Sequence, residues 1–212
     1  MTAIIAGATG ATGKDLLNLV LNDTSFSQVE IFVRHKPDIQ NSKLKTHIVD
    51  FDKTETWEHL VKGDVLFSCL GTTLKAAGSK AQQYTVDYQF QYNFAYAAKK
   101  NGVKSYVLVS SANASANSFF FYSKIKGDLE ESVKKLNFDR LIIFRPPLLI
   151  RKESDRKAEV FAEKLLNFLN SIGLFCSFRP LPTEKLAQAM INSVNKFNNG
   201  IHIIEPKEIL CI

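Results

Sequence analysis

The chain has 212 residues and a mass of 23.8 kDa, which predicts a single domain at roughly 150 residues per domain. Hydrophobic residues make up 45% and charged residues 23% of the chain, and these ordinary proportions exclude a mainly disordered protein. The net charge of +6 would suit an anionic partner, but there is no polybasic arm, so no nucleic-acid partner is expected.

Short apolar runs alternate with stretches of helical periodicity from the start of the chain to Pro147. Predicted strands occupy residues 2–6, 29–33, 47–49, 65–67, 106–109 and 141–144, and the longest predicted helices occupy 79–100 and 120–136. The strand runs are almost continuously apolar, which indicates that both of their faces are covered. Strands that alternate with helices form right-handed βαβ units, so the predicted fold class is α/β, a doubly wound parallel sheet of the Rossmann type.

The alternation ends at two consecutive prolines. The next segments are a charged stretch, a stretch of helical spacing and an aromatic loop, at 151–157, 160–168 and 173–182. An amphipathic helix is expected over 183–195 with Thr183 as its N-cap, and a last strand over 200–204. Because this part is too short for a second domain, we predict one domain over 1–212, in which 148–200 contribute a small C-terminal cap.

A run of seven small residues follows the first predicted strand and precedes the first helix. Its sequence is Gly-Ala-Thr-Gly-Ala-Thr-Gly, starting at Gly7. Glycines permit a positive φ and let backbone N–H groups approach a pyrophosphate, and the start of a helix adds positive potential. The run therefore predicts a dinucleotide-binding turn, with a tight turn that binds no ligand as the alternative. The residues expected to contact the cofactor here are Gly7, Thr9, Gly10, Ala11, Thr12 and Gly13.

The ends of the next three strands bear on the choice of cofactor. An NAD site usually has an acidic residue after the second strand, whereas this chain has Arg34 with Lys36 nearby. A guanidinium pairs well with a 2′-phosphate, so NADP is predicted over NAD, with an ordinary surface arginine as the alternative. Asp50, followed by Phe51, could accept a hydrogen bond from the adenine amino group. The segment expected to let the middle of the cofactor pass contains Leu70, Gly71 and Thr72.

A tyrosine and a lysine four residues apart, Tyr122 and Lys126, lie in the second long helix. This spacing places the phenol and the ammonium on one helix face. A nearby cation lowers the pKa of a phenol from its usual value near ~10, which makes the phenol a usable general acid or base. The pair is therefore the candidate catalytic group.

Two observations limit this assignment. The fifth strand ends in two serines, of which Ser111 is the predicted group that polarises a substrate carbonyl and Ser110 is the competitor. The same tyrosine–lysine spacing recurs at Tyr96 and Lys100. That copy precedes the strand that ends in the two serines, so its side chains are expected to pack against the rest of the protein or to face water.

The ordered motifs resemble those of an atypical short-chain dehydrogenase/reductase, most closely the Tat-interacting-protein oxidoreductase-like subgroup and its bacterial relatives. They are the glycine run, Val33-Arg34, Ser68-Cys69-Leu70-Gly71-Thr72-Thr73, Val109-Ser110-Ser111, Tyr-x-x-x-Lys and Phe144-Arg145-Pro146. The resemblance implies that Tyr122 is the acid/base, that Lys126 holds the nicotinamide ribose and tunes Tyr122, and that Ser111 orients the substrate. It also implies that Pro146 lies near the nicotinamide. Asn93 is a candidate for the family's active-site asparagine, with helix packing as the alternative.

The predicted function is an NADPH-dependent oxidoreductase that reduces a small carbonyl-type substrate. The alternative is an NADP(H)-binding regulatory or partner-binding protein without turnover. Because the cap is short, the substrate is expected to be compact. A set of hydrophobic residues is expected to line an apolar substrate pocket, with plain core packing as the alternative. They are Phe119, Phe120, Phe121, Leu148, Phe175 and Phe178.

Cysteine and histidine spacing predicts neither a disulfide framework nor a metal site. The three cysteines, Cys69, Cys176 and Cys211, have no regular spacing, and the four histidines form no HxxxH or HExxH motif. The first apolar run is too short for a signal peptide, and no apolar stretch approaches the ~18 residues of a membrane span. These patterns predict a cytoplasmic protein.

Overall fold

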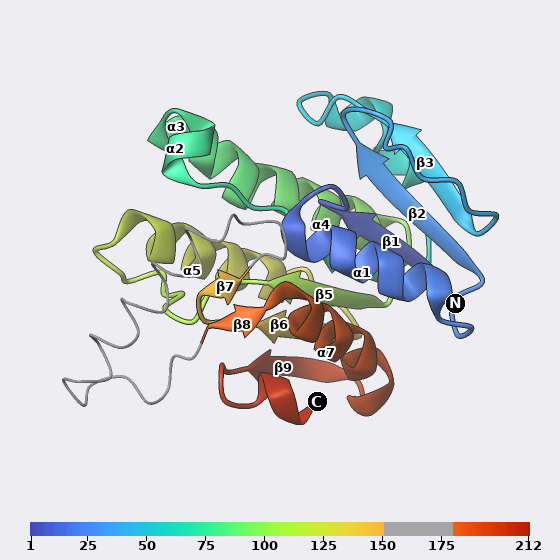
Figure 1. Cartoon of the computed structure of the whole chain (residues 1–212). Coiled ribbons are helices and arrows are strands. Elements are labelled where there is room, and N and C mark those ends of the chain that lie inside the picture. Colours follow the sequence, from blue (N-terminus) through green and yellow to red (C-terminus); the bar gives the residue numbers. More distant parts are fainter. Residues whose placement is uncertain (151–179) are drawn as a thin grey trace.

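A computed structural model describes residues 1–150 and 180–212. Seven parallel strands form one sheet in the order β3-β2-β1-β4-β5-β6-β9 (Figure 1). The strands are β1 (Thr2–Ala6), β2 (Gln28–Val33), β3 (Leu44–Ile48), β4 (Val65–Ser68), β5 (Ser105–Val109), β6 (Arg140–Phe144) and β9 (Gly200–Ile204). The direction of winding reverses between β1 and β4, where such sheets bind ligands at the carboxyl ends of their strands. The predicted doubly wound fold is confirmed.

Helices cover both faces of the sheet. α1 (Ala11–Asn22) and α7 (Thr183–Lys196) lie side by side on one face, and α4 (Gln91–Lys100) and α5 (Phe121–Lys134) pack on the other (Figure 1). The shorter elements are α2 (Leu74–Ala77), α3 (Lys80–Tyr84), the π-helical turn η3 (Thr85–Phe90), the 3-10 turns η1 (Thr54–Thr56), η2 (Glu58–Leu60) and η4 (Ile209–Cys211), and the parallel pair β7 (Leu149–Ile150) and β8 (Leu181–Pro182).

The central strands are buried on both sides. In β1, Ala3 and Ile5 pack under α1 and α7, while Ile4 and Ala6 point to the opposite core. That second core contains an aromatic cluster in which the ring centroids of Trp57 and Phe94 are 4.3 Å apart. Two-sided burial explains why these strands are almost continuously apolar in the sequence.

The single helix predicted over 79–100 is wrong in its interior. Ser79 caps α3 by accepting a hydrogen bond from the N–H of Gln82, but the helix then widens into η3 before α4 begins. A π turn contains one residue more than an α-helical turn. The order of polar and apolar residues does not mark that extra residue, so hydrophobic spacing does not reveal the turn. The turn brings Asp87 into the protein interior, where it is fully buried.

The carboxyl-terminal part differs from the expected cap. Helix α7 packs against α1, and β9 extends the main sheet beside β6. Thr183 is not the N-cap: Pro182 holds that position, and the Thr183 hydroxyl donates a 2.6 Å hydrogen bond to Asp15. The rest of the cap prediction, including the helix at 160–168, lies in residues 151–179, outside the described part of the chain.

Candidate functional site

The glycine run forms the turn between β1 and α1 and is packed tightly against the end of β4. Gly7 has a φ of +86°, and a Cβ there would lie 2.7 Å from the backbone of Cys69 and Leu70. A Cβ on Gly13 would lie 2.0 Å from the carbonyl oxygen of Gly7. Only glycine therefore fits at these two positions.

The outer side of this turn is open. Thr9 and Gly10 are exposed, and the N-cap of α1, Gly10, supplies no side chain to the first N–H groups of the helix. Uncapped N–H groups at the start of a twelve-residue helix form an anion site. The turn, with Ala11 and Thr12 in its first helical positions, is thus shaped to receive a pyrophosphate.

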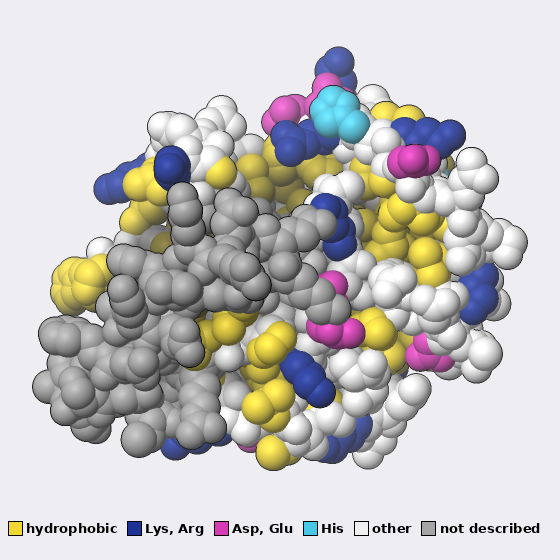
Figure 2. Space-filling model, in the orientation of Figure 1, with side chains coloured by type: hydrophobic (Ala, Val, Ile, Leu, Met, Phe, Trp, Pro, Cys, Tyr) yellow, Lys and Arg dark blue, Asp and Glu magenta, His cyan; other side chains and the backbone are white. Residues whose placement is uncertain are grey.

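Arg34 directly follows β2, the strand beside β1. Its side chain is exposed, and it makes no hydrogen bond or ion pair with any residue described in the structure. At the top of the view in Figure 2, basic side chains, acidic side chains and a histidine lie together on the surface. An unpaired guanidinium at this position can take a phosphate group.

The two residues expected near the adenine differ in accessibility. Asp50 is exposed, and its carboxylate accepts a hydrogen bond from the N–H of Asp52. The ring of Phe51 is buried in the aromatic core, edge-on to Phe90 and Phe94 with centroids 5.4 Å apart. Only the backbone of Phe51 is therefore placed to meet a ligand.

The segment after β4 approaches the buried Asp87. The N–H of Thr72 donates to Asp87 Oδ2 at 3.2 Å, and a Cβ on Gly71 would lie 3.4 Å from Asp87 Oδ1. Burial raises the pKa of the neighbouring Cys69 thiol to about 12, with the charge of Lys126 acting in the opposite direction. This thiol is therefore protonated near neutral pH and is a poor nucleophile.

The two serines after β5 have different partners. The Ser110 hydroxyl is buried and donates a 2.5 Å hydrogen bond to Glu130, whose two carboxylate oxygens also bind Arg145 at 3.1 and 2.7 Å. Those contacts with Glu130 raise the pKa of Arg145 above its ordinary value. The Ser111 hydroxyl is half-buried and has no hydrogen bond to the described residues. Of the two serines, only Ser111 could therefore contact a substrate.

Tyr122 and Lys126 occupy successive turns of α5. Tyr122 is 40% exposed, whereas Lys126 is only 2% exposed, and its Nζ lies 5.9 Å from the centre of the Tyr122 ring. The same Nζ is 3.1 Å from Asp87 Oδ1. The phenol is therefore accessible from outside, while the ammonium lies beneath it and faces a buried carboxylate.

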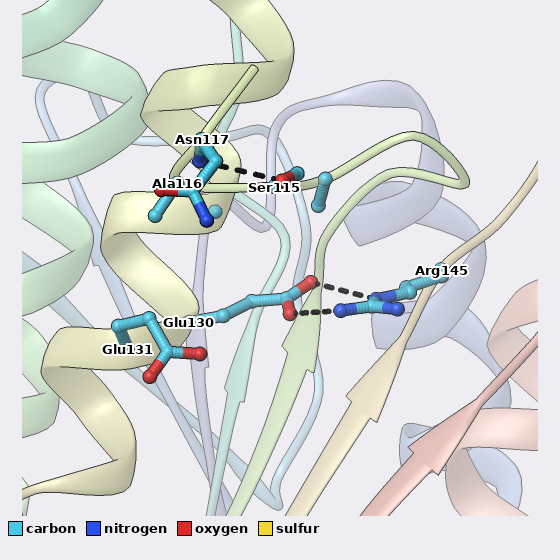
Figure 3. Close-up of a pocket in the computed structure, with 8 residues that line it drawn as sticks. Ser115, Ala116, Asn117, Glu130, Glu131 and Arg145 are labelled. Atoms are coloured by element: carbon cyan, nitrogen blue, oxygen red, sulfur yellow. Dashed lines mark hydrogen bonds and ion pairs between the residues drawn. The ribbon is translucent and has the colours of Figure 1, made fainter.

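A glycine next to this pair lets the serine loop, which is the segment between β5 and α5, contact α5. A Cβ on Gly127 would lie 2.1 Å from the backbone of Ser115 and Ala116, and the Ser115 N–H donates to the carbonyl of Ser123. The loop and the helix also enclose a pocket of about 390 Å³ (Figure 3). Its lining is Ala114, Ser115, Ala116, Asn117, Gly127, Glu130, Glu131 and Arg145. In Figure 3 the carboxylate of Glu130 points at the Arg145 guanidinium, so the central charges of the pocket already neutralise each other.

The second tyrosine–lysine pair lies outside this arrangement. Tyr96 is exposed at the end of a row of stacked tyrosines on α3, η3 and α4. Lys100 pairs with Glu58 at 2.9 Å, a contact that raises the pKa of Lys100. Asn93 donates to Thr54 and accepts from Gln89. These side chains serve packing and surface contacts.

No motif in the sequence pointed to Asp87. It is the only acidic residue between Asp64 and Asp128, and this isolation in an otherwise neutral or basic stretch could have marked it. Of the apolar residues expected around a substrate, Phe119, Phe120 and Leu148 are exposed on the surface. Phe175 and Phe178 fall among the residues that the structure does not describe.

Comparison with known families decides the class of the site. A family model described as NAD(P)H-binding matches residues 7–168. The chain belongs to this NAD(P)H-binding family. Within it, the chain is an atypical short-chain dehydrogenase/reductase of the subgroup that the motifs indicated, and that resemblance is confirmed. The cofactor is NAD or NADP, and the fold is oxidoreductase-like.

Relatives of this NAD(P)H-binding protein match along most of their length. The mitochondrial protein FMP52 of Candida albicans is 33% identical over 94% of this chain and 90% of its own length. The protein HTATIP2 of Rattus norvegicus is 35% identical over 99% of this chain and 88% of its own. Among solved structures, the UDP-glucose 4-epimerase of Thermotoga maritima has a TM-score of 0.73 at 11% identity, covering 97% of this chain and 76% of its own. At that identity the likeness shows the fold alone.

The predicted cytoplasmic location is wrong. Relatives from several fungi, among them Candida albicans and Eremothecium gossypii, are named as mitochondrial proteins. The patterns used for the prediction bear only on secretion and membrane spans, so they could not distinguish these compartments. In the described ranges 1–150 and 180–212, no helix has the length and apolar character needed to cross a membrane.

Proposed function

We propose that this protein is an NADPH-dependent oxidoreductase that reduces a small carbonyl compound with Ser111, Tyr122 and Lys126. The observation that carries the proposal is the arrangement on α5. An accessible phenol and a buried ammonium lie one helical turn apart, after the serine strand of an NAD(P)H-binding fold. A protein that only bound a dinucleotide would not need an accessible phenol at that point.

The residues around the site have separate roles in this proposal. The cofactor, when bound, supplies a hydride to the carbonyl carbon. Ser111 orients the carbonyl through its hydroxyl, and Tyr122 donates its phenolic proton to the carbonyl oxygen. Lys126 holds the nicotinamide ribose and favours the phenolate left after proton transfer. Pro146, buried where β6 ends, borders the nicotinamide.

The glycine turn supports the cofactor part of the proposal. Gly7 and Gly13 have no room for a Cβ, and the first turn of α1 has uncapped N–H groups for the pyrophosphate. Asp50 takes the adenine amino group, with the Phe51 backbone beside it. Leu70, Gly71 and Thr72 would border the middle of the cofactor. The unpaired Arg34 favours NADP over NAD, because a guanidinium can bind a 2′-phosphate through two hydrogen bonds.

A substrate screen tests the proposal. Purified protein is mixed with NADPH and with panels of small aldehydes, ketones and quinones, and the loss of NADPH absorbance is followed. We expect turnover of at least one compact carbonyl compound. NADPH binding without oxidation across all panels would contradict the proposed reduction and support a binding protein without turnover.

A further inference from the structure

Asp87 and Lys126 form an ion pair in the protein interior. Asp87 is 0% exposed and Lys126 is 2% exposed, and Nζ of the lysine lies 3.1 Å from Oδ1 of the aspartate. The two residues come from different elements, η3 and α5. Removing two charges from water carries a desolvation cost that their attraction only partly offsets. Such a pair is therefore weak evidence for stability, and a functional reason for it is worth seeking.

The Asp87 carboxylate also contacts the segment predicted to border the cofactor. Its Oδ2 accepts the backbone N–H of Thr72, and its Oδ1 lies where a Cβ on Gly71 would come within 3.4 Å. Oδ1 receives no well-aligned hydrogen bond from the described residues, so the charge of Lys126 is its main compensation. One carboxylate thus joins the loop after β4 to the lysine of α5.

Buried hydrogen bonds fix the position of the Asp87 backbone. The side-chain amide of Gln91 donates to the Asp87 carbonyl oxygen at 2.8 Å, and the Gln91 carbonyl accepts from the hydroxyl of Ser68 at 2.9 Å. All three residues are buried. Asp87 lies in the π-helical turn η3, a feature found frequently at functional sites. The hydrogen bonds that run from Ser68 of β4 through Gln91 therefore hold the backbone of Asp87 in place.

We propose that Asp87 is a positioning residue for the cofactor site and acts through Lys126. Its carboxylate holds the buried ammonium in place, and it takes only part of the lysine's hydrogen-bonding capacity. An ammonium has three N–H donors, so donors remain for the ribose hydroxyls on the nicotinamide side. This inference rests on the proposed function, because it requires a dinucleotide whose nicotinamide ribose meets Lys126.

The test compares a whole cofactor with its adenosine half. NADPH and adenosine 2′,5′-bisphosphate are titrated calorimetrically into the wild type and into Asp87→Asn. Only NADPH has the nicotinamide ribose, so the variant should lose about tenfold in NADPH affinity and keep its affinity for the bisphosphate. A general loss of structure would weaken both. Asp128→Asn is the matched control, because it removes one partly exposed carboxylate from α5, the helix that holds Lys126, and its affinities should equal those of the wild type.

A double-mutant cycle shows whether Asp87 acts through Lys126. On a Lys126→Met background, Asp87→Asn should cause no further loss of NADPH affinity. The double variant also removes both buried charges, so it remains informative if Asp87→Asn alone fails to fold. Wild-type NADPH affinity in Asp87→Asn, or a second tenfold loss on the Lys126→Met background, would overturn the inference. A wild type that binds NADPH no better than the bisphosphate would instead contradict the proposed function.

Discussion

Two serines that follow each other in the sequence have different surroundings. Ser110 is buried against Glu130, which Arg145 also binds, while the Ser111 hydroxyl has no hydrogen bond within the described part of the protein. A hydroxyl that donates to a buried carboxylate is committed to structure, because its loss would leave that charge partly unsatisfied. Ser110 is thus committed to structure, and Ser111 is the serine that the proposed function uses.

This difference predicts opposite effects of two alanine substitutions. Ser110→Ala should lower the free energy of unfolding by about 1.5–3 kcal/mol, the contribution typical of a hydrogen bond to a charged group. Ser111→Ala should change stability by less than about 0.5 kcal/mol but lower turnover on the order of 10²-fold. Urea unfolding and NADPH oxidation measure the two quantities. If Ser111→Ala is the destabilising variant, the assignment is reversed.

Arg34 leads to a second prediction for a single residue. The wild type should bind NADPH at least about tenfold more tightly than NADH, because a charge-assisted hydrogen bond contributes roughly 1.5–3 kcal/mol. Arg34→Asp should remove this preference by repelling the 2′-phosphate. Calorimetric titration with both cofactors gives the ratio.

Lys36→Asp is the control for Arg34, since it makes the same change of charge at an exposed position two residues away. Its NADPH-to-NADH ratio should stay close to that of the wild type. An equal loss in both variants would indicate long-range attraction instead of a contact with Arg34, and equal wild-type affinities would refute the preference.

At the scale of elements, close backbone approaches determine the shape of the site. Gly127 lets the serine loop contact α5. Gly7 lets the first turn approach the end of β4, and Gly13 lets the start of α1 approach the backbone of Gly7. Glycine spacing in the first turn was visible in the sequence because it falls in a short motif between a strand and a helix. The role of Gly127 was not visible, since the backbone that approaches it belongs to a separate segment of the chain.

Gly127→Ala should therefore destabilise the protein. In an isolated helix this substitution would be favourable by roughly 0.5–1 kcal/mol, but the added methyl would lie 2.1 Å from the backbone of Ser115 and Ala116. Overpacking of this kind costs about 1–3 kcal/mol, so the net change should be a loss. Thermal and urea unfolding measure it, with the exposed Lys135→Ala as the control. A stabilised Gly127→Ala would show that the loop does not approach α5 as described.

The sequence predicted regular elements better than side-chain partners. The central strands of the sheet are read from apolar runs because both of their faces are buried. The π turn at Thr85–Phe90 and the bond from Thr183 to Asp15 were missed. Each depends on tertiary contacts that local spacing does not encode. Asp87 was overlooked for the same reason, since its partner Lys126 is 39 residues away in a different helix.

Across the whole molecule, one edge of the sheet brings distant segments together. The glycine turn, Arg34, the segment after β4, Ser111 and Pro146 all follow the carboxyl ends of parallel strands. Because parallel strands end at the same edge, the topology gathers these groups around the point where the winding reverses. The proposed cofactor site lies at this edge of the NAD(P)H-binding fold, and α5 adds the groups proposed to use the cofactor.

The central claim is that Tyr122 supplies the proton in an NADPH-dependent reduction. Tyr122→Phe removes one hydroxyl from an exposed ring, so folding and NADPH affinity should be unchanged. Tyr96→Phe, the equivalent change in the other tyrosine–lysine pair, is the matched control.

The most direct measurement is the turnover number of both variants on a carbonyl substrate found by the screen, together with calorimetric NADPH affinities. General acid catalysis contributes roughly 10²–10⁴-fold. We expect Tyr122→Phe to lose turnover by a factor in that range while its NADPH affinity is retained, and Tyr96→Phe to reduce the substrate at the wild-type rate. Full activity in Tyr122→Phe would contradict the account.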